Sequence, residues 1–247
     1  MTGNPTLNQN TFTEVSTATG SEVMTVGGTV QKTAILLGLV VLSASYTWNL
    51  YFSNPADMGT MSGWAIAGGL GGFVIAMVTI FKNTWSPVTA PLYAICEGLF
   101  IGSISAITQA RYGVSVIQAV LLTFGTLAAL LGAYQTGIIR ASAPFKRGVI
   151  AATGGIAIAY FISIILGFFH IQVPFIAGSG LLSIGFSVFV VIIAALNLVI
   201  DFDFIEQGAK AGAPKYMEWY ASFSLLVTLV WLYLEILRLL TKISRRD

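Results

Sequence analysis

Residues 181–200 read LLSIGFSVFVVIIAALNLVI, a stretch with no charged side chain. A transmembrane helix needs about 20 consecutive, mostly apolar residues to cross the hydrocarbon core of a bilayer. The same criterion, applied outward along the chain between its charges, finds further stretches that reach or nearly reach this length. Together they predict seven spans that cover most of the chain: residues 33–52, 64–81, 88–107, 114–134, 149–169, 181–200 and 216–240.

The composition agrees with a membrane protein. Of the 247 residues, 56% are hydrophobic and only 9% are charged, whereas about a quarter of the residues in soluble domains are charged. The connections between the expected spans are short and rich in turn residues, so they leave no room for a separate catalytic domain. The sequence therefore predicts an all-α integral membrane protein, with a seven-transmembrane helix bundle over residues 32–247.

Residues 1–31 differ in kind, because they are rich in Thr, Ser, Asn and Gly and contain no Lys or Arg. We expect them to form a flexible polar tail. A secretory signal would need a basic start followed at once by an apolar run, and here the first apolar run begins only after Lys32. The first span is therefore expected to stay in the mature chain.

Several classes of function are disfavoured. The formal net charge of +2 is small and scattered, so there is no basic stripe for nucleic acid. The single cysteine, Cys96, and the single histidine, His170, leave a zinc cluster short of ligands, and Cys96 has no nearby base to make it a nucleophile. An intramembrane aspartyl protease is disfavoured because no Gly-x-Gly-Asp run lies in a span. We expect neither an enzyme nor a resident cofactor.

The basic residues predict a cytoplasmic amino terminus, because cytoplasmic loops are enriched in Lys and Arg. Those on the amino-terminal side are Lys32, Lys82, Arg140, Lys146, Arg147, Lys210 and Lys215, against Arg111 alone in the opposite loops. Seven full spans would place Lys242, Arg245 and Arg246 outside, which disagrees with this rule. Either the rule does not hold at this end of the chain or the last segment is re-entrant. The length of residues 216–240 favours a full crossing.

Small residues at helical spacing predict close packing of two spans. Gly68 with Gly72, and Gly98 with Gly102, each place two glycines on one helix face. Membrane helices approach closely through such faces, because lipid gives them no hydrophobic reason to associate. We expect the second and third spans to pack tightly.

Acidic side chains at membrane depth are costly, and they tend to face a bundle interior or water. Four lie within or at the end of expected spans: Glu97, Asp201, Asp203 and Glu235. Glu97 has no basic neighbour in its own span, so it is either neutral and structural, or paired with another helix, or in contact with water. For Asp201 and Asp203 the plain alternative is a solvated helix end in headgroup water.

Helical spacing separates the two aspartates. Asn197 and Asp201 are four residues apart and share a face, whereas Asp203 points nearly to the opposite side. One aspartate can therefore face the bundle while the other faces water.

A polar stripe follows three- and four-residue steps along the last span and needs an interior to face. Its members are Thr228, Trp231, Glu235, Arg238 and Lys242. Because Glu235 and Arg238 are three residues apart, a local ion pair near the membrane boundary is the plain alternative for Glu235.

Two carboxylates in a poorly hydrated place cannot both ionise cheaply, so a pair of them can share a proton and act as a pH switch. Once deprotonated, the same oxygens are hard ligands suited to calcium. Proton and cation would then compete for one site.

Three stretches resemble the Bax inhibitor-1 family, in particular its bacterial branch. Residues 200–208, IDFDFIEQG, are similar to the Asp-x-x-x-Ile ending of the family's sixth helix, and residues 231–240, WLYLEILRLL, to the Leu-Tyr-Leu-Asp run of its last helix. Glu97-Gly98 is similar to a Glu-Gly pair in the third span of relatives. The resemblance covers nearly all of the chain after the polar tail.

This resemblance implies a multi-pass protein of the cell (inner) membrane in which six helices surround the last. It also implies that two acids of the final two helices form a pH-responsive latch on a calcium leak. By motif those acids are Asp201 and Glu235, which together would also contact Ca²⁺. Some relatives carry a basic residue in the second span that holds the closed pair, and Arg238 is the candidate substitute here.

The geometry of the last two helices has two alternatives. A turn near Pro214 would set Asp201 level with Thr228, whereas direct pairing of Asp201 with Glu235 requires a turn nearer Glu218.

Two functions therefore stay open. The first is a pH-sensitive cation leak, chiefly for Ca²⁺, whose partners are the lipid bilayer and calcium ions. The second is an interaction protein that regulates a membrane protease or stress response through a membrane protein partner. The second would depend on the polar tail before Lys32 rather than on Asp201.

Overall fold

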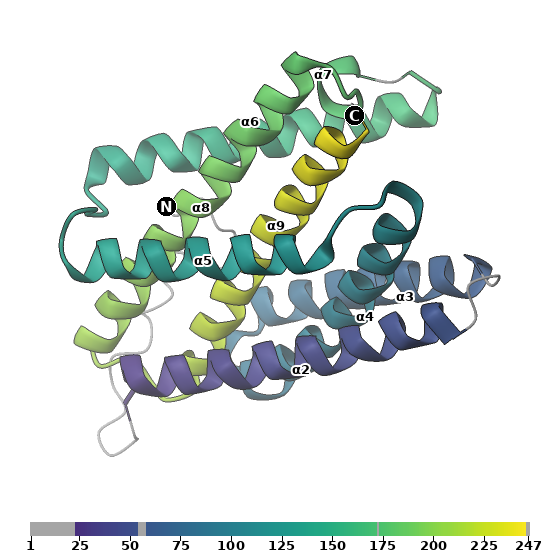
Figure 1. Ribbon diagram of the computed structural model, residues 1–247. Coiled ribbons are helices and arrows are strands. Elements are labelled where there is room, and N and C mark those ends of the chain that lie inside the picture. The colour runs from purple at the N-terminus through teal and green to yellow at the C-terminus, as the bar shows by residue number, and fades with distance from the viewer. Residues whose placement is uncertain (1–22, 54–57, 172, 246–247) are drawn as a thin grey trace.

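The computed structural model describes residues 23–53, 58–171 and 173–245, which are helical almost throughout (Figure 1). The elements are α2 (Val26–Ser53), α3 (Met58–Phe81), the 3-10 helix η1 (Asn83–Trp85), α4 (Ser86–Tyr112), α5 (Val116–Gln135), α6 (Ala143–Phe168), α7 (Pro174–Ala177), α8 (Leu181–Lys210) and α9 (Met217–Ser244). All but η1 and α7 are long and apolar enough to span a membrane. The seven-span prediction is confirmed. The expected tail falls mainly on residues 1–22, which lie outside the described residues.

Local sequence explains where several helices begin and end. The Thr25 hydroxyl accepts a hydrogen bond from the Gly28 backbone N–H at 2.9 Å, so α2 begins earlier than residue 33, the expected start of the first span. Ser115 and Ser142 cap α5 and α6 in the same way. Gly113, at φ 67°, closes α4, because a left-handed residue is easiest for glycine.

The last two long helices form an antiparallel hairpin. α8 continues past the expected end at residue 200 to Lys210, and Gly212, at φ 68°, then turns the chain. α9 starts at Met217. The turn therefore lies around Pro214, the first of the two alternatives derived from the sequence.

Helix α9 is the centre of the bundle. It packs against α2, α4, α5 and α8, and 67% of its most apolar stretch is buried, compared with 11% for α5 and for α6. The outer helices instead present large apolar side chains outward, such as Ile158 and Phe161 on α6. The expectation of a central last helix is confirmed.

Glycines allow close contact around α4. A Cβ atom on Gly68 would lie 2.7 Å from the carbonyl oxygen of Cys96, so α3 and α4 pack tightly as expected. A Cβ atom on Gly102 would lie 2.3 Å from the carbonyl oxygen of Ala44 in α2. The α4 glycines therefore pack against the first span, α2. The sequence did not indicate this contact.

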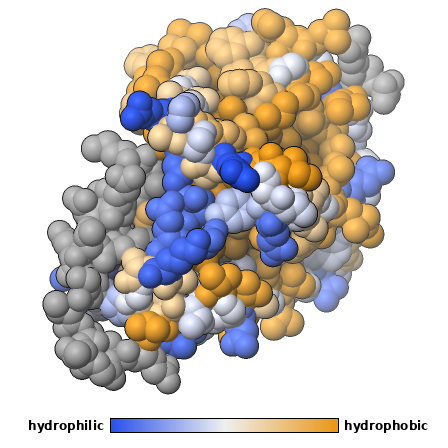
Figure 2. All heavy atoms as spheres, turned by 90° about the vertical axis from the view of Figure 1, so that its left-hand side faces the viewer, coloured by the Kyte–Doolittle hydropathy of each residue, from blue (hydrophilic) through white to orange (hydrophobic). Residues whose placement is uncertain are grey.

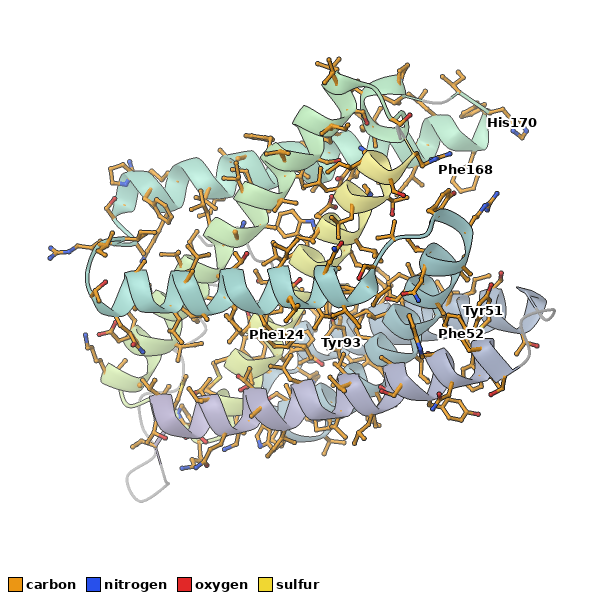
Figure 3. All side chains as sticks on the ribbon, in the orientation of Figure 1. Tyr51, Phe52, Tyr93, Phe124, Phe168 and His170 are labelled. Carbon is orange, nitrogen blue, oxygen red and sulfur yellow. The ribbon has the colours of Figure 1, made fainter. Side chains whose placement is uncertain are left out.

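Polar residues gather at the end of the bundle where α2 and α6 begin and α8 ends. Figure 2 looks onto this end and shows a hydrophilic patch near the middle, with apolar residues above it and to its right. Along the bundle, Tyr93 points inside and packs edge-on against Phe223, whereas Phe168 and His170 lie at the far end of α6 (Figure 3). The distribution fits a bundle with one polar end and an apolar circumference.

Candidate functional site

A row of polar contacts joins α6 to α8 and α9. Lys146, Thr153 and Tyr160 are seven residues apart on α6, about two helical turns, so they lie on one face. The contacts are an ion pair of Lys146 with Asp203, a hydrogen bond from Asn197 to the Thr153 hydroxyl at 2.8 Å, and one from Tyr160 to the Glu235 carboxylate at 2.9 Å. We name these six residues the polar seam. It extends about 21 Å along α6, which is most of a hydrocarbon core of about 30 Å.

Glu235 lies at the end of the polar seam farthest from Lys146 and is 2% exposed. One guanidinium nitrogen of Arg238 donates to both of its carboxylate oxygens, at 3.0 and 3.2 Å. The same guanidinium lies 4.7 Å from the centroid of the Tyr160 ring. The local ion pair considered from the sequence is present, and Tyr160 adds a contact from a second helix, α6.

Lys242 fixes the register of α8 against α9. Its ammonium donates to the Ser187 hydroxyl at 2.8 Å and to the Ser183 carbonyl at 3.3 Å. Antiparallel helices rise by the same distance per residue, so each step forward along α8 from this contact matches one step back along α9. Asp201 therefore lies level with residues 224–228 of α9. Glu235 lies about 10 to 17 Å further along the axis. The structure therefore does not bring Asp201 and Glu235 together.

The two aspartates of α8 occupy different surroundings. Asp201 is 1% exposed and lies one turn after Asn197 on the same face. The Asp203 side chain is 19% exposed, pairs with Lys146 and accepts a hydrogen bond from Gln207 at 2.5 Å. One aspartate thus faces the bundle and the other reaches the polar end, as the spacing predicts.

Glu97 lies in α4, away from the polar seam. Its carboxyl is hydrogen-bonded to Tyr93, one turn earlier in the same helix. A Cβ atom on Gly72 of α3 would lie 2.8 Å from one of its oxygens, so the glycine leaves room for the carboxyl. Glu97 therefore has a partner within its own helix.

The seven spans and the central last helix are the arrangement that the family resemblance implied, whereas the expected contact between Asp201 and Glu235 is not formed. The chain matches the model of the family described as Bax inhibitor 1 like over residues 4–245. The chain belongs to the Bax inhibitor 1-like family. Searches of curated proteins and of solved structures found no match.

This Bax inhibitor 1-like chain has a further buried carboxylate that the sequence reasoning missed. Glu218, in the first turn of α9, is completely buried and accepts hydrogen bonds from the backbone N–H and the hydroxyl of Thr25, both at 2.9 Å. It also pairs with Lys32, and the Lys215 ammonium lies 3.4 Å away. Only Lys215 is near in sequence, so the long-range partners left no local signal. The cluster joins the start of α2 to the start of α9.

The described residues contain no group of three or more His, Cys, Asp or Glu side chains that could hold a metal ion. Calcium takes about six to eight oxygen ligands, so at each carboxylate of the spans it would also need hydroxyl, amide or carbonyl oxygens. A single carboxylate supplies at most two of these ligands.

Proposed function

We propose that this Bax inhibitor 1-like protein is a pH-sensitive cation leak, chiefly for Ca²⁺, in the inner membrane of a bacterial cell. Asp201 and Glu235 are the ion-binding and pH-sensing groups of this proposal, and Asp203, Glu97, Asn197 and Arg238 support them. The polar seam is the observation that carries it, because it holds oxygen-bearing side chains at three depths of a bundle with an apolar circumference.

The proposed closed state is the arrangement described, in which the groups of the polar seam bond to one another. Glu235 is held by Arg238 and Tyr160, and Asp203 by Lys146. Opening would need α6 to move away from α8 and α9. Because α6 is peripheral and lipid can replace its apolar neighbours, this movement has a low hydrophobic cost.

Proton and cation compete for the proposed carboxylates. A protonated carboxyl is neutral and a poor ligand for Ca²⁺, whereas the ionised form supplies hard oxygen ligands. Opening frees the carboxylates from Arg238 and Lys146, so that they can contact the cation. The flux through the open state is therefore expected to be high at high pH, where the carboxylates are ionised, and low at low pH, where they are protonated.

The test is Ca²⁺ flux into proteoliposomes between about pH 5 and about pH 8, with wild type, Asp201→Asn and Glu235→Gln. Each substitution removes one titrating group, so we expect reduced flux at the high end and a flatter pH profile. Glu206→Gln is the matched control, because its carboxylate is exposed at the end of α8 and pairs with Lys210. It should retain the wild-type profile.

Two results would oppose the proposal. Protein that conducts nothing at any pH would remove the leak, and unchanged pH profiles in both variants would remove the assigned acids. In the first case the role in regulating a membrane protease or stress response becomes the better account. That role predicts loss of partner binding when residues 1–31 are removed.

We also propose a cytoplasmic amino terminus. Lys32, Lys146, Arg147 and Lys210 lie at the end of the bundle where α2 and α6 begin. Lys242, which disagrees by position, is 5% exposed and bonded to Ser187. It therefore does not act as a solvated loop charge, which weakens the disagreement.

A further inference from the structure

Two cavities open between α2 and α5. The first, of about 980 Å³, lies toward the start of α2, and the second, of about 480 Å³, toward its end. Leu37 borders both, and α9 contributes Leu225 to one and Leu229 to the other. We name them together the α2–α5 groove. Its lining on α2 runs from Val26 to Trp48, about 33 Å along the axis and comparable to the bilayer core.

The walls of the α2–α5 groove are mainly apolar. Val30 and Leu131 border the first cavity, and Val41 and Ile117 border the second. All four are exposed, and both helices are candidate membrane spans. The opening between them therefore faces lipid, and its length and apolar walls fit an acyl chain.

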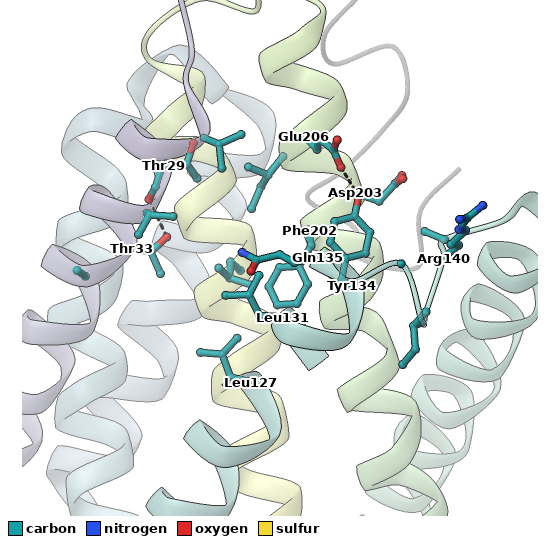
Figure 4. A pocket seen from close by; sticks show the side chains of 18 of the residues that line it. Thr29, Thr33, Leu127, Leu131, Tyr134, Gln135, Arg140, Phe202, Asp203 and Glu206 are labelled. Atoms are coloured by element: carbon teal, nitrogen blue, oxygen red, sulfur yellow. Dashed lines mark hydrogen bonds between the residues drawn. The ribbon is translucent and has the colours of Figure 1, made fainter. Parts of the chain in front are cut away.

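One end of the groove is polar. Figure 4 shows Asp203, Glu206 and Arg140 at the same end of the first cavity. Asp203 pairs with Lys146, and Glu206 with Lys210. Arg140 is exposed and has no ion-pair partner among the described residues.

The uncompensated charge is therefore positive and lies at the level of the headgroups. A guanidinium binds a phosphate through two parallel hydrogen bonds. Arg147, also exposed, adds positive charge at the start of α6. An anionic headgroup is complementary to this end, whereas a zwitterionic headgroup brings its own cation.

We infer that the α2–α5 groove binds an anionic phospholipid, with an acyl chain between α2 and α5 and the phosphate at Arg140. Residues 1–22 are the rival occupant within the chain. They are rich in Thr, Ser and Asn, which match apolar walls poorly, so lipid is the better fit. The site is separate from the seam contacts of Thr153 and Tyr160, and the inference does not rest on the proposed leak.

The test is electron paramagnetic resonance of the full chain in liposomes that contain spin-labelled phosphatidylglycerol or spin-labelled phosphatidylcholine. The motionally restricted fraction of each label measures its association with the protein. In wild type we expect phosphatidylglycerol to be preferred about fivefold, the effect of one basic residue near a membrane surface. Arg140→Gln should bring the preference close to one. Lys82→Gln, an exposed basic residue outside the groove, should leave it unchanged.

A second pair of variants tests the walls. Ala34 lines the groove, whereas the adjacent Ile35 does not and is 52% exposed. Ala34→Trp should lower the restricted fraction of both labels, and Ile35→Trp should not. Both variants keep an exposed position of α2, so loss of folding does not explain a difference between them.

Four results would overturn the inference. The first is equal association of the two labelled lipids with wild type, and the second is an equal preference for phosphatidylglycerol in Arg140→Gln and Lys82→Gln. The third is loss of that preference on addition of free inorganic phosphate. The fourth is a preference that appears only after residues 1–22 are deleted. The third would make the site one for free phosphate, and the fourth would make the tail the occupant.

Discussion

Gly28 is the residue on which the junction between α2 and α9 depends most directly. A Cβ atom there would lie 2.1 Å from a carboxylate oxygen of Glu218. That carboxylate cannot withdraw easily, because it is fully buried and held by Thr25 and Lys32. The adjacent Gly27 has nothing within 4 Å of the same ideal atom.

We expect Gly28→Ala to lower the free energy of unfolding by about 1 to 3 kcal/mol, the usual cost of overpacking. Gly27→Ala should be neutral or stabilise by up to about 1 kcal/mol, because alanine favours a helix. Thermal unfolding of both variants in detergent measures the difference. Equal stabilities would contradict the packing described for Glu218.

How far the site could be predicted from sequence depends on the range of each contact. The ion pair between Glu235 and Arg238 could be predicted, because the two residues are three positions apart on one helix. The contact of Glu235 with Tyr160 depends on how α6 packs against α9, which no local pattern specifies. The seven-residue spacing of Lys146, Thr153 and Tyr160 was nevertheless a usable signal for a polar face on an apolar span.

At the scale of elements, α4 is held between α2 and α3 by glycines. Gly98 and Gly102 lie against the backbone of α2, and Gly68 lies against the backbone of α4. Hydropathy predicted where these spans lie but not how far the helices extend, because capping residues and hairpin turns set their ends. It also could not tell which neighbour each glycine faces.

We expect Gly102→Ala to lower the free energy of unfolding by about 1 to 3 kcal/mol. Its Cβ would meet the Ala44 carbonyl oxygen at 2.3 Å, and backbone atoms cannot rotate away. Gly125→Ala in α5 is the matched control, because nothing lies within 4 Å of that position. Denaturation in mixed micelles measures the free energy of unfolding of both variants. If Gly125→Ala lost as much stability as Gly102→Ala, the result would argue against a close α2–α4 contact.

At the scale of the whole molecule, α9 lies at the centre and packs against α2, α4, α5 and α8, and the bundle has seven candidate spans. Helices α2, α3, α5 and α6 bury between 11% and 22% of their most apolar stretch, whereas α9 buries 67%. Such a bundle can exchange outer contacts for lipid while its centre stays packed.

With a cytoplasmic amino terminus, as proposed from the basic residues, seven crossings predict that the carboxyl terminus is outside. Reporter fusions that are active on only one side of the membrane measure this directly. A reporter active in the cytoplasm should work at the amino terminus and fail after residue 247. Activity at both ends would mean that α9 does not cross fully.

The most direct measurement of the central claim is Ca²⁺ flux through a Thr153→Cys variant, in a Cys96→Ala background, before and after a cationic thiol reagent. Thr153 lies in the middle of the polar seam, and Ile158, on the same helix, is 62% exposed and faces outward. The account predicts that the reagent blocks flux in Thr153→Cys and leaves flux in Ile158→Cys unchanged. Intact flux in both variants after labelling, or equal block in both, would contradict passage along the polar seam.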